Sequence, residues 1–421
     1  MNAEIIFPRT TSLERGEFRG LAFALGFFFS FRLAIVLICA QVLGLEPSTG
    51  TALSIGIDVG LFGLIVFSSM GGENESFGSV LRLPAVRWAG LFLLFSCVSL
   101  AWSETASLGN SIVYWIGLVI DFANVLLLMR RESRQDDAAS ILKGFIWSSC
   151  LLAIVAWLMP LQPDLRLGDE EFFNTNEIAN LCALAIFFAQ YLTRRNGEHW
   201  GFAKFLLVIT LVRSLSKSTL VAFLISQSLL LIMDRSMSRK TKAFLMISAV
   251  VVILAFWGLF EAYYDVYTTA GNQAETLTGR TAIWLYVGSA IFDHPWNLWV
   301  GHGFDSWWKV VPPFGNEKFE ARHAENEVLQ QLYVYGAAGI VLLAGIYGSL
   351  FRQLRKLPQC PTKTMFLVVL VFIVVRGVAV ADSFDLLLPL WSIALISLLA
   401  NLEHVGGKRI AAVASLRALR D

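Results

Sequence analysis

Long apolar runs recur along the chain, and they constrain its fold more than any other feature. Of the 421 residues, 56% are hydrophobic and only 15% are charged, and the charged residues collect in short breaks between the runs. A transmembrane helix needs roughly 20 consecutive apolar residues, whereas barrel strands show alternation over about ten. The pattern therefore predicts an all-α polytopic membrane protein. It excludes a soluble globular enzyme, a disordered chain and a single-span anchor.

The apolar runs predict twelve transmembrane helices. The expected spans are 20–44, 51–70, 84–101, 109–129, 141–160, 176–193, 199–213, 217–233, 242–260, 327–349, 364–380 and 385–402. A long hydrophilic segment separates spans nine and ten. The chain therefore divides into 1–260 with spans 1–9, the outer loop 261–326, and 327–421 with spans 10–12 and a tail.

The lysines and arginines predict the orientation of these spans. If the amino terminus is cytoplasmic, the inside segments hold 24 of the 33 cations, and every inside segment is basic. Cytoplasmic loops carry this excess, so we expect both termini inside and the loop 261–326 outside. The remaining cations are Arg32, Arg166, Arg213, Lys217, Arg280, Lys309, Lys318, Arg322 and Arg376. Each of them needs a local reason.

Three of these cations lie at or within the predicted spans. Arg213 and Lys217 sit in a very short outer turn between spans seven and eight. Arg376 lies in the outer half of span eleven, shortly before Asp382. An intramembrane ion pair that braces two helices is one interpretation of Arg376 and Asp382. Contact with a substrate is the other.

The outer segment is rich in aromatic residues, among them Trp284, Trp296, Trp299, Trp307 and Trp308. One interpretation is an interfacial belt that lies on the lipid headgroups. The other is a set of apolar faces for sugar rings, with N–H groups near the sugar hydroxyls. One loop can do both.

His323 has surroundings suited to proton transfer. It precedes Glu325 and stands where the chain re-enters the membrane as span ten. An imidazole beside a carboxylate at this boundary can accept a proton near neutral pH, and an ordinary polar helix cap is the alternative. No HExxH sequence or paired-aspartate motif accompanies the histidines, and the five cysteines are scattered singly, so we predict no metal site and no cofactor.

Four sequence elements resemble the O-antigen ligase and polymerase superfamily. They are Asn174-Thr175-Asn176 with Ala179, Ser216-Lys217, the stretch from Thr278-Gly279-Arg280 through Trp284 and Asp293-His294-Pro295 to Gly301-His302-Gly303-Phe304, and His323 to Gln330 followed by Gly336 and Gly339. They occur in the family's order. The second histidine of the family's "HxHN" is Glu325 here, and its Ser-Arg pair reads Ser216-Lys217. Lys217 therefore keeps the charge but loses bidentate geometry.

The resemblance implies an inner-membrane glycosyltransferase of the GT-C type. It implies a glycan donor on undecaprenyl pyrophosphate at the periplasmic face, and the length and modest loop fit best the ligase that joins O-antigen to lipid A–core. An O-antigen polymerase and a protein O-oligosaccharyltransferase are alternatives within the superfamily. A secondary transporter is the alternative from another class, although the unpaired cations lie at one face rather than at mid-depth. The expected partners are the lipid-linked donor, lipid A–core and membrane lipids, with no nucleic acid.

The chemistry assigns a role to each candidate residue. Charge builds on the departing pyrophosphate, so fixed cations lower the barrier, and direct displacement inverts the anomeric centre. We expect His323, Arg280, Lys217 and Glu325 to be catalytic. His323 is the expected base, and it either accepts the proton alone or shares this role with Glu325. The expected substrate-binding residues are Arg213, Arg322, Arg376, Asp382, Asn176, Trp284 and His302.

Cysteine labelling tests the predicted topology. Cysteines introduced near positions 136, 238 and 356 should be labelled only from the cytoplasm, because their segments are basic, and those near 270 and 315 only from outside. Labelling of position 315 from the cytoplasm would overturn the orientation and the position of the proposed site.

Overall fold

The computed structural model shows a bundle of helices. It describes residues 19–70, 76–131, 133–162, 165–168, 173–233, 238–240, 242–243, 247, 251, 254, 258, 277–306, 323–382 and 384–418. The described elements are α1 (Gly20–Leu37) with a π-helical continuation η1 (Ile38–Val42), α2 (Pro47–Ser69), α3 (Phe77–Leu81), α4 (Pro84–Ser99), α5 (Leu108–Leu128), α6 (Arg134–Leu158), α7 (Thr175–Asn196), α8 (Gly201–Arg213), α9 (Lys217–Met233), α12 (Leu277–Phe292), α13 (Pro295–Val300), α15 (Glu327–Arg355), α16 (Pro361–Arg376) and α17 (Leu390–Ala418). No strand occurs within these residues.

Every predicted span except 242–260 coincides with one of these helices, and 242–260 falls mostly outside the described residues. Five described helices are long and apolar enough to cross a membrane by themselves: Gly20–Val42, Ser48–Ser69, Leu108–Leu128, Arg134–Leu158 and Glu327–Arg355. The others are shorter or less apolar. A helical membrane protein is therefore confirmed, and twelve crossings stay a prediction.

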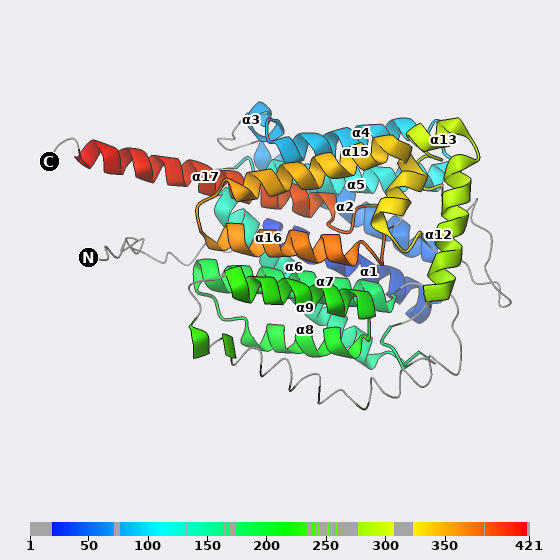
Figure 1. Ribbon diagram of the computed structural model, residues 1–421, viewed down its shortest axis with the longest axis horizontal. Helices are drawn as coiled ribbons and strands as arrows, with labels where there is room; N and C mark the ends of the chain where they lie inside the picture. Colours follow the sequence, from blue (N-terminus) through cyan, green and yellow to red (C-terminus); the bar gives the residue numbers. More distant parts are fainter. Residues whose placement is uncertain are drawn as a thin grey trace.

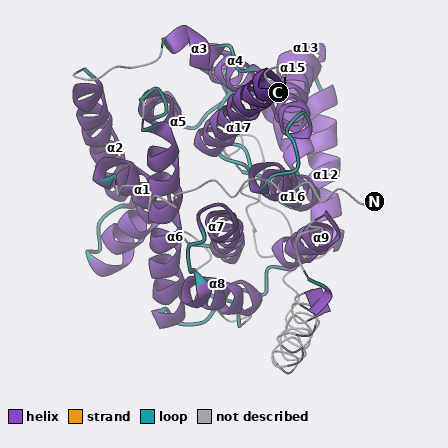
Figure 2. Cartoon of the chain, turned by 90° about the vertical axis from the view of Figure 1, so that its left-hand side faces the viewer, coloured by secondary structure: helices purple, strands orange, loops and turns teal. Residues whose placement is uncertain are grey.

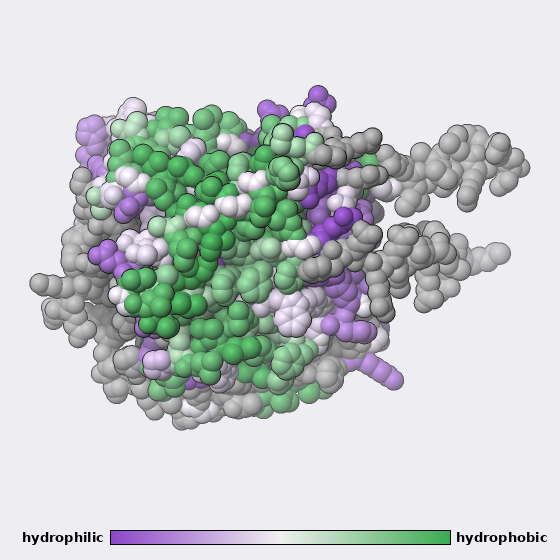
Figure 3. Space-filling model, turned by 180° about the vertical axis from the view of Figure 1, so that it is seen from behind, coloured by the Kyte–Doolittle hydropathy of each residue, from purple (hydrophilic) through white to green (hydrophobic). Residues whose placement is uncertain are grey.

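The surface of the bundle matches a membrane environment. Figure 3 shows a broad hydrophobic band with hydrophilic residues gathered toward the two ends. Large apolar side chains on this surface are unusually exposed, with Phe67 at 78%, Leu158 at 81% and Phe202 at 76%. Such contiguous exposed apolar surface marks contact with lipid or another apolar phase.

One helix lies at the centre of the bundle. Figure 2, viewed along the bundle, shows α7 enclosed by α6, α8, α9 and α16, and more than half of its residues are buried. α7 begins at the cap Asn174, whose Oδ1 accepts the N–H of Glu177 at 3.0 Å, and ends at Gly197 in the left-handed conformation. These are ordinary start and stop signals. The start of α7 therefore has a fixed place among its neighbours.

Predicted inside residues gather at one end of the bundle, which we call the basic end. There Lys143 of α6 pairs with Glu198 at 2.9 Å, and Arg195 of α7 lies 3.6 Å from Glu403 of α17. Figure 1 shows α17 projecting past the bundle at this end, while α12 and α13 lie at the other. The described part of the loop 261–326 is thus partly helical, since α12 crosses the ends of the other helices.

α15 bends where α13 packs against it. Gly336 has φ 61° inside α15, and a Cβ there would lie 2.4 Å from the carbonyl carbon of Trp299. The bend frees two carbonyls of α15, and the backbone N–H groups of His302 and Gly303 donate to them, at 3.0 Å to Tyr333 and 2.9 Å to Val334. Buried backbone groups need such partners. The glycine after the histidine element is therefore explained by close backbone approach.

Arg32 is paired inside the bundle. Its guanidinium contacts Asp121 of α5 at 2.5 Å, and Asp121 is buried. Burial of a cation in a span is tolerated when a carboxylate neutralises it. The ion pair with Asp121 therefore explains why Arg32 lies outside the basic cytoplasmic segments.

The contact between α1 and α6 rests on two glycines. A Cβ at Gly144 would lie 2.1 Å from the carbonyl oxygen of Phe23, and one at Gly26 would lie 1.9 Å from that of Ile141. Small residues allow helix backbones to approach closely within membranes. This contact places α1 along the length of α6.

Replacing Gly144 by alanine should destabilise the protein by about 1–3 kcal/mol, because the methyl group meets backbone that cannot turn away. Thermal unfolding in detergent measures the effect. Gly117→Ala is the matched control, since a Cβ there meets nothing within 4 Å. Equal unfolding temperatures for the two variants would contradict the close α1–α6 packing.

Candidate functional site

Polar side chains from three helices meet at the end of the bundle opposite the basic end. Arg376, the last residue of α16, donates from Nε to Thr219 Oγ1 and from one terminal nitrogen to the carbonyl oxygen of Asn176, both at 3.2 Å. Ser216 Oγ lies 2.6 Å from Asn176 Oδ1 and 2.9 Å from Thr219 Oγ1. We call these four residues the Arg376 cluster. It brings together the predicted residues Asn176 and Arg376.

The guanidinium of Arg376 keeps one nitrogen without a hydrogen bond. The residue is only 3% exposed, and Nη1 is buried with no hydrogen-bond partner among the described residues. Buried guanidinium nitrogens normally have acceptors, and leaving one unpaired is costly. The cluster therefore presents a donor and a positive charge to any anion that reaches it.

Helix starts add positive potential to the same region. α7 begins at Thr175, next to Asn176, and α9 begins at Lys217, next to Ser216. α15 begins at Glu327, and the backbone N–H of Glu327 donates to the carbonyl oxygen of Gly377 at 2.8 Å. Gly377 directly follows Arg376 in the chain. The amino end of each helix carries a partial positive charge and attracts anions. These ends add positive potential around Arg376, which the first-turn carboxylates Glu177 of α7 and Glu327 of α15 partly offset.

Four acidic residues compensate the charge of Arg376. It interacts electrostatically with Asp382, Glu327, Glu177 and Glu325. Asp382 does not form the direct brace that the sequence suggested, since its Oδ1 accepts the N–H groups of Phe384 and Asp385 at 2.9 Å. Asp382 therefore holds its own turn, and its effect on Arg376 is long-range.

A second group of predicted residues lies together at the entry to α15. Glu325 Oε2 is 3.5 Å from a terminal nitrogen of Arg280, and Glu325 Oε1 is 3.5 Å from His323 Nδ1. The backbone N–H of Glu325 donates to the same His323 Nδ1 at 3.2 Å. All three side chains are between 15% and 24% exposed, so a ligand can reach them. The structure thus brings Arg280, His323 and Glu325 together.

The loop that carries His323 is fixed from both sides. Trp284 of α12 donates from Nε1 to the carbonyl oxygen of Ala324 at 2.9 Å, and Gln330 Oε1 accepts the N–H of Ala324 at 2.8 Å. Glu325 has φ 51°, a left-handed conformation that is uncommon for this residue type. Trp284 therefore positions the loop through its indole nitrogen.

His302 is built into the fold. It is 4% exposed, its Nδ1 lies 3.0 Å from the carbonyl oxygen of Tyr333, and its Nε2 lies 3.1 Å from the side-chain nitrogen of Asn297. A carbonyl only accepts, so Nδ1 donates to Tyr333, and Nε2 faces the side-chain amide of Asn297. Both ring nitrogens have partners within the protein, and contact between His302 and a substrate stays a prediction.

The remaining predicted cations are placed differently. Arg213 is buried and donates to the carbonyl oxygen of Leu165 at 2.6 Å, so it holds the chain before α7. Lys217 is exposed at the start of α9. Arg322, like Trp307 and Trp308, lies outside the described residues. On α13, Trp296 and Trp299 are 55% and 65% exposed, which suits either lipid headgroups or sugar rings.

Three polar residues escaped the sequence reasoning, namely Glu327, Asp305 and Thr219. Glu327 is buried, and its Oε1 accepts from the Tyr347 hydroxyl at 2.8 Å and from the N–H of Leu387 at 3.1 Å. Asp305 accepts from Ser111 at 2.6 Å, and burial raises the pKa of its carboxyl. Only the place of Thr219, one turn after Ser216, carried a usable signal, because both face the same side of α9's first turn.

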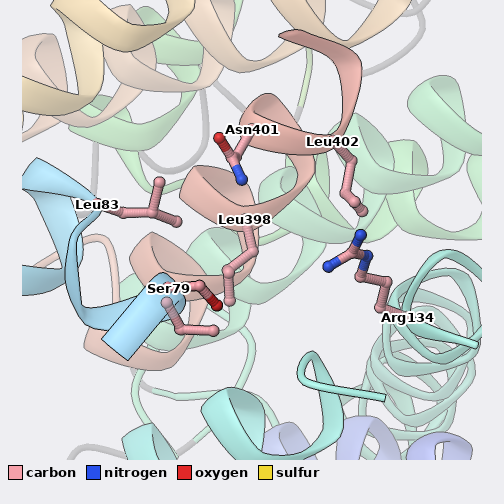
Figure 4. Close-up of a pocket in the computed structure, with 7 residues that line it drawn as sticks. Ser79, Leu83, Arg134, Leu398, Asn401 and Leu402 are labelled. Carbon is pink, nitrogen blue, oxygen red and sulfur yellow. The ribbon is translucent and has the colours of Figure 1, made fainter. Parts of the chain in front are cut away.

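A small cleft at the basic end has no part in these clusters. Figure 4 shows that it is lined by Ser79, Val80, Leu83, Arg134, Leu398, Asn401 and Leu402. Within the described ranges, no group of three or more His, Cys, Asp or Glu side chains is arranged to hold a metal ion.

Residues 202–344 match the family model of O-antigen ligase. The matched stretch contains the turn at Ser216 and Lys217, Arg280 and the His323 loop, and it confirms the resemblance to the O-antigen ligase and polymerase superfamily. None of the curated proteins matches the sequence significantly.

Proposed function

We propose a function for this chain as a member of the O-antigen ligase and polymerase superfamily: it transfers an oligo- or polysaccharide from undecaprenyl pyrophosphate to a sugar hydroxyl of lipid A–core. The reaction takes place at the periplasmic face of the inner membrane, with both termini in the cytoplasm. The observation that carries the proposal is the buried, incompletely bonded guanidinium of Arg376 among three helix starts, at the bundle end that also holds Arg280, His323 and Glu325.

The donor pyrophosphate fits the cations at this end. Arg376 offers Nη1, Arg280 offers a terminal nitrogen 3.5 Å from Glu325, and Lys217 stands at the first turn of α9. Charge-assisted hydrogen bonds to phosphate oxygens are strong, and they strengthen further as negative charge develops on the leaving group. We propose that these cations neutralise the pyrophosphate when it binds and that transfer needs no metal ion.

The bond changes follow from this placement. The acceptor hydroxyl oxygen attacks the anomeric carbon, the bond from that carbon to the pyrophosphate oxygen breaks, and the electron pair leaves with the pyrophosphate. The hydroxyl proton passes to His323 or, alternatively, to Glu325, whose carboxylate lies 3.5 Å from the imidazole. A single displacement inverts the anomeric centre. The exposed Trp296 and Trp299 supply faces for the glycan or for the headgroups.

The molecule that accepts the glycan distinguishes the ligase from the other enzymes of the superfamily. An O-antigen polymerase would use the same donor cations and add the glycan to a growing chain, and a protein O-oligosaccharyltransferase would add it to a protein side chain. We favour lipid A–core because the modest loop 261–326 fits the ligase best among the members of the superfamily. A secondary transporter would need its charged groups at mid-depth, whereas the two clusters lie at one end of the bundle.

Removal of the donor cations should abolish transfer. Arg280→Ala and Lys217→Ala should each lower the rate by about 10²-fold or more, because each removes a charge that faces the pyrophosphate. Lys217→Arg should retain part of the activity, and chelators should have little effect. A transfer assay in proteoliposomes measures the rates, with the exposed Arg352→Ala as control. A parental rate for Arg280→Ala, or a strict requirement for a divalent ion, would contradict the donor site.

Removal of His323 should lower transfer by about 10²–10⁴-fold, the usual contribution of a general base, while donor binding survives. Transfer by the parent protein should fall as the pH is lowered, because a protonated imidazole cannot accept the hydroxyl proton. His404→Ala, on α17, is the matched control. Normal turnover of His323→Ala with unchanged pH dependence would leave His323 as a helix cap.

A further inference from the structure

In the structure, Nδ1 of His323 is engaged by the protein's own backbone. Its Nδ1 accepts the backbone N–H of Glu325 at 3.2 Å, and a backbone N–H can only donate. A neutral imidazole that accepts at Nδ1 carries its proton on Nε2. The one lone pair that could take a proton from a substrate is therefore turned toward the protein's own backbone.

Glu325 stands between this imidazole and the donor cation. One carboxylate oxygen lies 3.5 Å from Arg280, and the other lies 3.5 Å from His323 Nδ1. Among the residues that the structure describes, Oε2 is buried without a hydrogen bond, as is Nε of Arg280, so the ion pair is not closed by good geometry. The residue also has φ 51°, and side chains in this conformation persist only where their surroundings impose it. A weakly bonded carboxylate with two partners in reach can change partner.

We propose that Glu325 is a positioning residue that couples donor binding to activation of the base, an inference that rests on the proposed function. When the donor pyrophosphate binds Arg280, it replaces the carboxylate of Glu325. The freed carboxylate then accepts a hydrogen bond from His323 Nδ1. Nδ1 thereby gives up the hydrogen bond that it accepts from the backbone N–H of Glu325. The imidazole proton moves from Nε2 to Nδ1, and the Nε2 lone pair becomes available to the acceptor hydroxyl.

The protons balance in both steps. The ring holds one proton before and after the donor binds, and only its position changes. During transfer, Nε2 takes the proton of the acceptor hydroxyl, and the imidazolium formed lies beside the Glu325 carboxylate, which stabilises it. The charged groups near this pair in the described part of the chain are Arg280 of α12, Arg376 of α16, which interacts electrostatically with Glu325, and Glu327 at the start of α15. None of them occupies the place of Glu325 next to Nδ1.

This role explains why a carboxylate can replace the second histidine of the family's element. A second imidazole could not form an ion pair with Arg280, whereas Glu325 does. The consequence is an order of events, in which the base is ready only after the donor is bound. Acceptor hydroxyls that arrive first remain protonated.

Kinetics of Glu325→Gln test the coupling. The variant should bind the donor more tightly, with KM for the donor lowered about 3–10-fold because Arg280 is released, while kcat falls about 10-fold or more. The pH dependence of kcat should also move to lower pH, because the imidazolium loses its carboxylate partner. Glu325→Asp should recover part of kcat. Glu198→Gln, which removes an ion-paired carboxylate at the basic end, is the matched control.

Two results would overturn the inference: parental kcat and pH dependence in Glu325→Gln, or loss of kcat at every pH with an unchanged donor KM, as a purely structural role would give. Arg280→Ala and His323→Ala separate this failure from failure of the proposed function. If both lose transfer while Glu325→Gln behaves as the parent, only the coupling is wrong. If both keep transfer, the proposed site itself is wrong.

Nitrogen NMR of histidine-labelled protein gives a readout without turnover. Addition of undecaprenyl pyrophosphate should convert His323 Nδ1 from unprotonated to protonated, and the change should be absent in Glu325→Gln. An Nδ1 that stays unprotonated in the parent when the lipid binds would refute the proposal.

Discussion

The buried guanidinium of Arg376 is the interaction on which the arrangement of the site depends. An uncompensated cation in a membrane span costs about 2.5–3.5 kcal/mol, so the surrounding helices must supply acceptors. Thr219 from α9 and the backbone of Asn176 from α7 do so, and Glu327, Asp382, Glu177 and Glu325 supply negative charge at longer range. These requirements hold the starts of α7, α9 and α15 near the end of α16.

The sequence predicts the helices well because hydrophobic length is a local property. Each apolar run outside 242–260 is a helix, with boundaries shifted by a few residues. α12 was missed because Arg280 and its polar neighbours lowered the average hydrophobicity of a segment that is otherwise apolar from Ala282 onward. The bend at Gly336 was also unpredictable, since it depends on the approach of α13, which is separated from it by a long stretch of chain.

The sequence identified several residues that the structure brings together at the candidate site, but it could not predict which atoms they contact. The motifs identify Arg280, His323 and Glu325, and the structure places them together. By contrast, His302 and Arg213 also look like ligands in the sequence, and in the structure both bond backbone carbonyls, those of Tyr333 and Leu165. Spacing along the chain cannot separate these cases. The difference lies in which carbonyls the tertiary contacts leave without partners.

We propose that this end of the bundle moves a glycan from a lipid pyrophosphate to lipid A–core, and a reconstituted reaction measures that transfer. The purified protein in proteoliposomes would receive undecaprenyl-pyrophosphate-linked glycan with lipid A–core, free glycan chains and a serine-containing protein as competing acceptors. We expect a lipid A–core product that bears the glycan with inverted anomeric configuration. Glycan found only on the other acceptors, or no consumption of the donor, would contradict it.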